Sequence, residues 1–277
     1  MTTPPDHHDP YDVSTEGLPD DAVDTPAGLS RRDAGVWLAR AGVSVGALAL
    51  LAGCASPGPS RPPMSSRDIR PARRTGAADS VRNTPGAKAL ERYRARQADA
   101  GVLPPGVIAR STWTNARPVA SRAKPLGSIT RITVHHDGMS PFTSTSRDLA
   151  ARRLESIRRA HVGSNGWADI GYHYAIDPAG RVYEARPTVI QGAHVKYNNE
   201  GNLGILVMGN YQRQRPTDAT MRTLERFVVD RARAYRLSRD DIHTHRELRP
   251  TACPGKYLQR HMESVRARGG AIAIAMA

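Results

Sequence analysis

Short apolar segments alternate with amphipathic segments over the last two thirds of the chain, and this alternation is the feature that most constrains the fold. Residues 128–138 (SITRITVHHDG) are rich in β-branched residues such as Ile132 and Val134. They are expected to form a buried strand that carries His135 near its carboxyl end. Residues 202–211 (NLGILVMGNY) are expected to form another apolar strand.

Residues 170–186 (IGYHYAIDPAGRVYEAR) predict two strands joined by a turn at residues 177–180. Three further segments have the spacing of helices: residues 143–162, 217–238 and 254–268. The first has Ser146 as a candidate N-cap, and its apolar positions are Leu149, Leu154 and Ile157. The apolar face of the second consists of Met221, Leu224, Phe227 and Val228.

Strands and helices that interleave in this way predict an α/β fold with a single mixed β-sheet flanked by helices. The folded domain is expected to cover residues 105–268, and a domain of about 170 residues can bury a sizeable core. Residues 269–277 are expected to form a C-terminal tail, because Gly269 and Gly270 end the last helix.

The first 53 residues predict an acidic tail followed by an export signal. Residues 1–29 are acidic, rich in proline and without apolar periodicity, so we expect them to be disordered. Arg31 and Arg32 then precede an apolar run at 43–52, which is too short to span a bilayer and resembles a twin-arginine signal peptide.

Residues 51–54 (LAGC) resemble a bacterial lipobox, in which the chain is cut before the cysteine and the cysteine is lipidated. We therefore expect lipidation at Cys54 and a protein at the outer face of the cell membrane. The alternative is an ordinary secretion signal cut near Ala52 or Ala55, with the protein released to the cell wall.

Residues 54–104 are rich in Pro, Ser, Arg and Ala and predict a flexible tether that contains one short helix over residues 86–101. From Cys54 onward the chain holds 37 basic and 18 acidic residues, a formal charge of +19, which favours an anionic partner. An arginine-rich genome would give the same composition. Nucleic acid is not expected, because the basic run has almost no aromatic residues for base stacking and the chain carries an export signal.

Cys253 is one of two cysteines, so Cys54 is its only intramolecular disulfide partner. If Cys54 is lipidated, Cys253 is either a buried small residue or a working thiolate. Catalytic zinc takes three protein ligands and keeps one open position, and His135, His245 and Cys253 are donors of the right type. The separation of His245 from Cys253 is longer than in zinc fingers, so the spacing alone leaves structural roles open.

Four segments resemble, in order, the type-2 N-acetylmuramoyl-L-alanine amidase and peptidoglycan recognition protein family. They are ITVHHDG, GWADIGYHYAID, GAHVKYNNEGNLGILVMGNY and HTHRELRPTACPG, and VIARSTWTNARPVASRAKPLG resembles the segment that opens the recognition-protein branch. The resemblance covers residues 107–265 and implies the fold of that family. It also implies zinc bound by His135, His245 and Cys253, with catalytic roles for Tyr172 and Thr251 and a groove position for His194.

The resemblance implies zinc-dependent hydrolysis of the amide between N-acetylmuramic acid and L-alanine in peptidoglycan. The alternative is a non-catalytic peptidoglycan-binding module on a lipid tether, although relatives without activity typically lack the cysteine ligand. We expect a monomer. Asn198 and Trp167 are candidate substrate contacts. Alternatively, Asn198 shapes a turn and Trp167 belongs to the core. Asp137 departs from the family, which usually has a small residue there. His136 and His173 should face away from His135 and Tyr172 and serve the structure.

Overall fold

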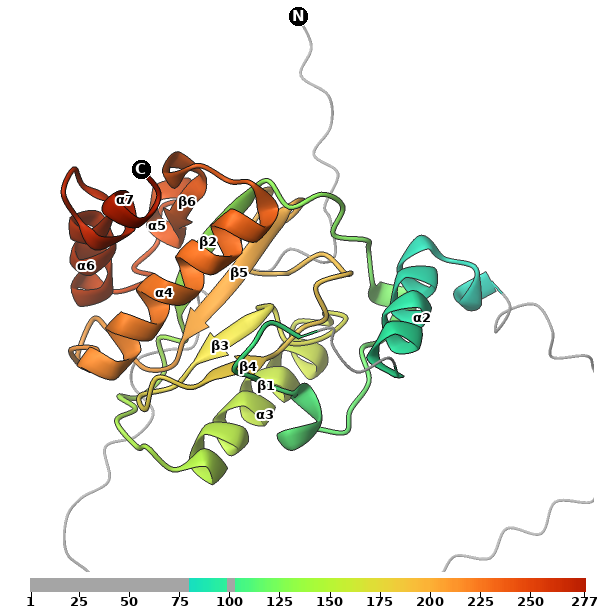
Figure 1. The fold of residues 1–277 in the computed structure, drawn as a ribbon. Coiled ribbons are helices and arrows are strands. Elements are labelled where there is room, and N and C mark those ends of the chain that lie inside the picture. Colours follow the sequence, from blue (N-terminus) through green and yellow to red (C-terminus); the bar gives the residue numbers. More distant parts are fainter. Residues whose placement is uncertain (1–79, 99–102) are drawn as a thin grey trace, which may run out of the picture. The chain divides into compact units, whose positions relative to one another are not determined.

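The computed structural model describes residues 80–98 and 103–277. The predicted acidic tail and signal peptide at residues 1–53 and the predicted lipidation site at Cys54 lie outside these ranges. One six-stranded sheet organises the domain, in the order β1-β4-β3-β5-β2-β6 (Figure 1). The strands are β1 (Val107–Ile108), β2 (Arg131–His136), β3 (Tyr174–Ile176), β4 (Val182–Glu184), β5 (Asn202–Val207) and β6 (Ile242–Thr244). Only β3 and β4 pair antiparallel, so the sheet is mixed and the predicted fold class is confirmed.

The two long strands, β2 and β5, lie side by side in the sheet and are buried along most of their length. They pair in parallel with His135 opposite Leu206. Side chains alternate between the faces of a strand, so Ile132 and Val134 point to one face while His135 points to the other. Both apolar residues are fully buried, which fixes the register and therefore the face to which His135 belongs.

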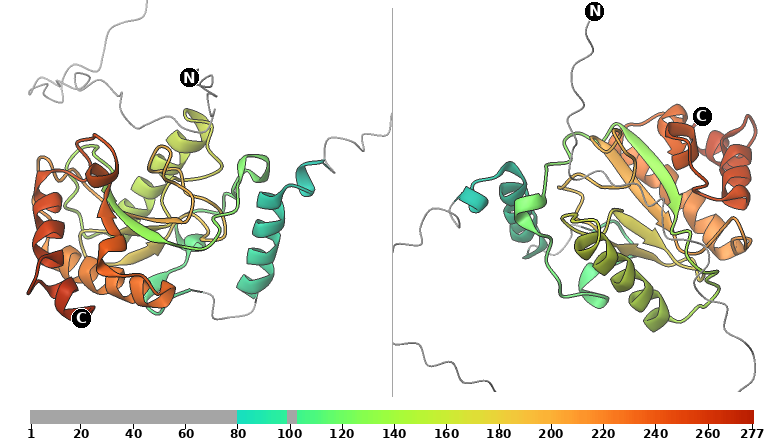
Figure 2. Two further views of the ribbon diagram at one scale, coloured as in Figure 1. Left: turned by 90° about the horizontal axis from the view of Figure 1, so that it is seen from above. Right: turned by 180° about the vertical axis from the view of Figure 1, so that it is seen from behind.

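Helices cover both faces of the sheet (Figure 2). On the Val134 face lie α4 (Asp218–Tyr235), α6 (Lys256–Arg266) and α7 (Ala271–Ala275), and their apolar residues form one core cluster with the strands. On the other face α3 (Arg147–Gly163) packs over the β3, β4 and β5 part of the sheet. The other helices are α2 (Pro85–Ala98) and the short α5 (His245–Leu248), η1 (Arg110–Thr112), η2 (Ala120–Arg122) and η3 (Arg239–Asp241).

The first predicted helix begins where expected, but its buried face differs. Ser146 caps α3, and its side chain accepts a hydrogen bond from the Leu149 backbone N–H. The buried residues are Ala150, Leu154, Ile157 and His161. Leu149 is 41% exposed, because a spacing of five residues from Leu154 turns it away from the sheet.

Two segments expected to be a tether and a tail contain packed helices. The short helix predicted within residues 86–101 is present as α2, and Leu90 is buried in a cluster with Ala123 and Ile190. At the other end, α7 places Ile272 in the main core, where it is fully buried. Within residues 80–98 and 103–277, no helix combines the length and the apolar character needed to cross a membrane.

Candidate metal centre and its surroundings

Two neighbouring parallel strands bring the two histidines together. Val134 of β2 pairs with Thr244, the last residue of β6, so the residues that follow them, His135 in β2 and His245 at the start of α5, lie side by side. Their ring centroids are 4.7 Å apart. Thr244 caps the one-turn helix α5 by a reciprocal hydrogen-bond pair with Glu247, which holds His245 at the start of that turn.

Cys253 reaches the same place from the loop after α5. Its Sγ lies 3.6 Å from Nδ1 of His135 and 3.4 Å from the backbone N of His136. The Thr251 hydroxyl accepts a hydrogen bond of 3.2 Å from the Cys253 backbone N–H and so shapes the loop. The structure therefore brings the three predicted ligands together.

The three donors fit a zinc ion. One ligand atom each from His135, His245 and Cys253 lie within 4.8 Å of one another. Zn–N and Zn–S bonds of about 2.0–2.3 Å in a tetrahedron place ligand atoms roughly 3.4–3.8 Å apart, so the 3.6 Å pair already matches. Three protein donors leave a fourth position for water or substrate, as in catalytic zinc sites.

Burial sets the protonation of the donors. It lowers the pKa of His135 well below its usual value and that of His245 to about 4, so both imidazoles are neutral at neutral pH. Neutral imidazole is the form that binds metal. Burial raises the pKa of the Cys253 thiol to about 12. Metal binding at neutral pH must therefore displace the thiol proton.

A hydrogen-bonded chain fixes the tautomer of His135. Nε2 of His194 lies 3.2 Å from the carbonyl oxygen of Asn202, which can only accept, so His194 donates there. Nδ1 of His194 is then the acceptor for Nε2–H of His135, at 3.0 Å. The remaining nitrogen of His135, Nδ1, carries the free lone pair and faces Cys253.

Two further residues, Asn199 and Gly204, support this hydrogen-bonded chain, and Gly204 was not identified from the sequence. The Asn199 side-chain oxygen accepts hydrogen bonds from the backbone N–H groups of His194 and Val195, at 2.8 and 2.9 Å. A Cβ at Gly204 would lie 2.7 Å from the His194 ring. A glycine inside an apolar strand often marks such a close approach, so Gly204 is the sequence feature that could have predicted this contact.

Tyr172 lies beside the cluster, in the segment before β3. Its ring centroid is 5.2 Å from that of His135 and 6.2 Å from that of His194. Burial, followed by the nearby Cys253 and Asp137, raises the pKa of Tyr172 above its usual value. The phenol stays protonated at neutral pH and can donate a hydrogen bond to a developing negative charge.

The other histidines of these strands have structural partners. Nδ1 of His136 accepts from the Tyr211 backbone N–H at 3.1 Å, and Nδ1 of His173 accepts from Gly204 at 3.0 Å. The Asp137 carboxylate accepts two hydrogen bonds from the Arg153 guanidinium, at 2.8 and 2.6 Å, and one from the Gly209 backbone N–H. This unusual carboxylate therefore ties the end of β2 to α3.

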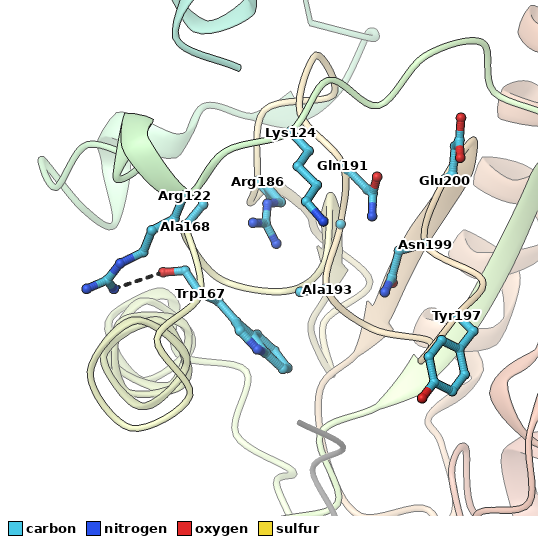
Figure 3. A pocket seen from close by; sticks show the side chains of 11 residues that line it. Arg122, Lys124, Trp167, Ala168, Arg186, Gln191, Ala193, Tyr197, Asn199 and Glu200 are labelled. Atoms are coloured by element: carbon cyan, nitrogen blue, oxygen red, sulfur yellow. Dashed lines mark hydrogen bonds between the residues drawn. The ribbon is translucent and has the colours of Figure 1, made fainter. Parts of the chain in front are cut away.

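The two candidate substrate contacts lie in other surroundings. Asn198 belongs to a turn, in which its side chain donates to the Lys196 carbonyl and its own carbonyl accepts from Asn202. Trp167 is 4% exposed, its ring lies tilted against that of His161 at a centroid distance of 4.5 Å, and it lines a separate pocket of about 340 Å³ (Figure 3).

The chain is similar to known proteins in both sequence and fold. Residues 125–256 match the sequence profile of the family described as N-acetylmuramoyl-L-alanine amidase. Human N-acetylmuramoyl-L-alanine amidase is 34% identical over 160 residues, which are 56% of this chain and 27% of the human protein. Peptidoglycan-recognition protein SC2 of Drosophila melanogaster is 31% identical over 155 residues, 56% of this chain and 83% of that protein. The solved structure of peptidoglycan recognition protein LE in complex with tracheal cytotoxin, a monomeric diaminopimelic acid-type peptidoglycan, superposes with a TM-score of 0.50 at 26% identity, over 57% of this chain and 93% of that one.

Proposed function

Because the chain belongs to the family of N-acetylmuramoyl-L-alanine amidases and peptidoglycan-recognition proteins, we propose that it hydrolyses the amide bond between N-acetylmuramic acid and L-alanine in peptidoglycan. The observation that carries the proposal is the convergence of His135, His245 and Cys253 from three segments. A module that only bound its ligand would not need a cysteine thiol and two neutral imidazoles around one point. The matched part spans about a quarter of the human amidase, so the activity and the substrate of this chain are proposed and are not carried over from that protein.

The proposed cofactor is Zn²⁺, held by Nδ1 of His135, one ring nitrogen of His245 and Sγ of Cys253. When bound, zinc would polarise the scissile carbonyl and lower the pKa of a water molecule. His194 holds His135 in the tautomer that presents Nδ1. Tyr172 supplies a protonated phenol where the amide oxygen gains charge, and the Thr251 hydroxyl, two residues before Cys253, is a second candidate donor.

A muropeptide digest analysed by mass tests the proposal. Purified protein with zinc should release stem peptides that begin with a free L-alanine amine, and a chelator should stop the release. Cys253→Ala should bind less zinc and lose at least about 100-fold in rate, because catalysis by zinc requires the ligand set. Arg268→Ala, which removes an exposed cation outside the site, should keep both properties. If the protein holds one zinc per chain and binds the cell wall but releases no stem peptides, the non-catalytic alternative is favoured.

We further propose that the domain is exported as a monomeric lipoprotein with its anchor at Cys54. The support is the sequence alone: two arginines, a short apolar run and LAGC. In cells, the protein should partition with membranes, and Cys54→Ala should move it to the soluble fraction or block its processing. Equal partitioning of the two proteins would reject the anchor and leave an ordinary secretion signal.

A further inference from the structure

Arg246 connects two of the three proposed zinc ligands. It follows His245 directly in the one-turn helix α5, which continues from β6 at the edge of the sheet (Figure 1). Nε of Arg246 donates to the Thr251 carbonyl at 3.1 Å, and Nη2 donates to the Ala252 carbonyl at 2.8 Å. One guanidinium therefore holds the two residues that precede Cys253.

The base from which Arg246 reaches the loop is itself fixed. Glu247, the next residue, accepts from the Thr244 backbone N–H at 2.8 Å and pairs with Arg266 of α6. The capping pair of Thr244 and Glu247 holds the turn, so the two charged side chains of α5 serve different partners. Within residues 80–98 and 103–277, Arg246 has no carboxylate partner, and its acceptors are the two loop carbonyls.

The other hydrogen bonds of the loop at residues 250–255, the Cys253 loop, do not tie it to α5. The Cys253 backbone N–H donates to the Thr251 hydroxyl at 3.2 Å, and the Gly255 N–H donates to the Ala252 carbonyl at 2.7 Å. Both bonds lie inside the loop and set its local shape. Among the described residues, the hydrogen bonds between the loop and α5 are those of Arg246.

A metal ion makes the position of this loop critical. Productive sites hold their side chains to within about 0.5 Å, because metal–ligand distances vary little. His245 belongs to α5 and Cys253 to the loop, so their separation depends on what joins these two segments. The charge of Arg246 acts in the same direction. Burial raises the pKa of the Cys253 thiol to about 12, and the His136 backbone N–H and the Arg246 charge both oppose that rise.

We propose that Arg246 is a positioning residue of the metal centre, whose guanidinium holds the Cys253 loop against α5 so that His245 and Cys253 can bind one ion. Its two donors face two consecutive carbonyls, a forked arrangement that lysine cannot reproduce. The role rests on the proposed zinc site, but it does not depend on which bond the protein cleaves.

Competition for zinc with a chromophoric chelator tests this role on the whole chain. Arg246→Ala should bind zinc at least about tenfold more weakly than the parent, because two hydrogen bonds from a charged donor are lost. Arg246→Lys keeps the charge without the fork and should have an intermediate affinity. Arg249→Ala is the matched control, because it removes a cation of the same segment that lies over the Tyr197 ring, 5.3 Å from its centroid. It should not weaken zinc binding.

Hydrogen exchange of the metal-free protein measures the loop without any ion. The backbone N–H groups of Cys253 and Gly255 should exchange at least about tenfold faster in Arg246→Ala than in the parent. The exchange of core amides in β2 and β5 should stay unchanged, which separates a loosened loop from a destabilised fold.

Three results would overturn the proposal: parental zinc affinity in Arg246→Ala, parental affinity in Arg246→Lys, or equal weakening by Arg246→Ala and Arg249→Ala. The last two would assign the effect to charge alone. A parent protein that binds no zinc rejects the proposed metal centre itself. In that case unchanged exchange of the Cys253 and Gly255 amides in Arg246→Ala would also reject the contact as a support of the loop, so the two failures are distinguishable.

Discussion

A single nitrogen atom decides whether His135 can serve as a ligand. Either ring nitrogen of a neutral histidine can bind metal. When one of them donates a hydrogen bond, the other carries the lone pair that binds the metal. Here the selection starts at the Asn202 carbonyl and passes through His194 to Nε2 of His135. His194 thus has a positioning role in addition to the groove position that the family resemblance implies for it.

His194→Ala should lower zinc affinity by about 10- to 100-fold, as is usual when the partner of a ligating histidine is lost. The physical reason is that Nε2–H of His135 loses its acceptor and the ring loses its fixed orientation. Competition with a chromophoric chelator measures the affinity, and the ring ¹⁵N shifts of His135 without metal report its tautomer directly. His194→Gln retains an acceptor and should recover part of the affinity.

His261→Ala is the matched control, because it removes another partly buried histidine, which belongs to α6 on the Val134 face of the sheet and pairs with Glu225 of α4. Its zinc affinity should equal that of the parent protein. If His194→Ala also keeps the parental affinity and the same His135 tautomer, the hydrogen-bonded chain has no positioning role.

At the scale of elements, long periodic segments were predicted well and short ones were missed. The strand that carries His135, the hairpin at residues 170–186 and the helices α3, α4 and α6 follow from apolar spacing. The edge strands β1 and β6 have two and three residues, and unlike the equally short β3 and β4 they are not joined to a neighbouring strand by a recognisable turn. They form because the neighbouring strands offer unpaired backbone groups, and that information is tertiary.

The same limit explains why only part of the site could be predicted from the sequence. Residue types and the family resemblance identified His135, His245, Cys253 and Tyr172. The role of His194 toward His135 depends on Gly204 in β5 and on the Asn202 carbonyl, which approach only after the sheet has formed. Similarly, Asp137 could be assigned to Arg153 only once α3 was placed over the sheet.

The helix α2 should contribute to the stability of the domain. Leu90 is 2% exposed and packs in a cluster with Ala123 and Ile190, although composition suggested that this helix lies in a tether. Leu90→Ala should lower the free energy of unfolding by about 2–4 kcal/mol, the range for deleting a buried leucine side chain. Urea unfolding of the chain measures it.

Glu91→Ala is the control on the exposed side of the same helix, and its free energy of unfolding should stay within about 0.5 kcal/mol of the parent. Equal midpoints for Leu90→Ala and Glu91→Ala would mean that α2 contributes nothing to the folded unit. The segment would then act as the flexible tether that its composition predicts.

Across the whole molecule, buried neutral histidines make stability depend on pH. Burial lowers the pKa of His161 and of His173 to about 3, with a smaller effect of Arg186 on each. An unfolded histidine titrates near 6.5. Between about pH 6.5 and 3 the unfolded chain therefore binds protons that the folded protein does not, and stability must fall as pH falls through this window.

The His161→Gln variant isolates one of these protons. His161 accepts a hydrogen bond of 3.0 Å from the Gly171 backbone N–H, and glutamine retains an acceptor but does not titrate. The variant should be less stable at pH 7, because it loses the imidazole packed on Trp167. Between pH 6 and 4.5, however, the parent should lose about 1.4 kcal/mol more per pH unit than the variant.

Urea unfolding of both proteins at equal zinc measures the two slopes. Parallel curves would show that His161 is protonated in the folded protein at these pH values, and the assignment of a neutral core histidine would be wrong.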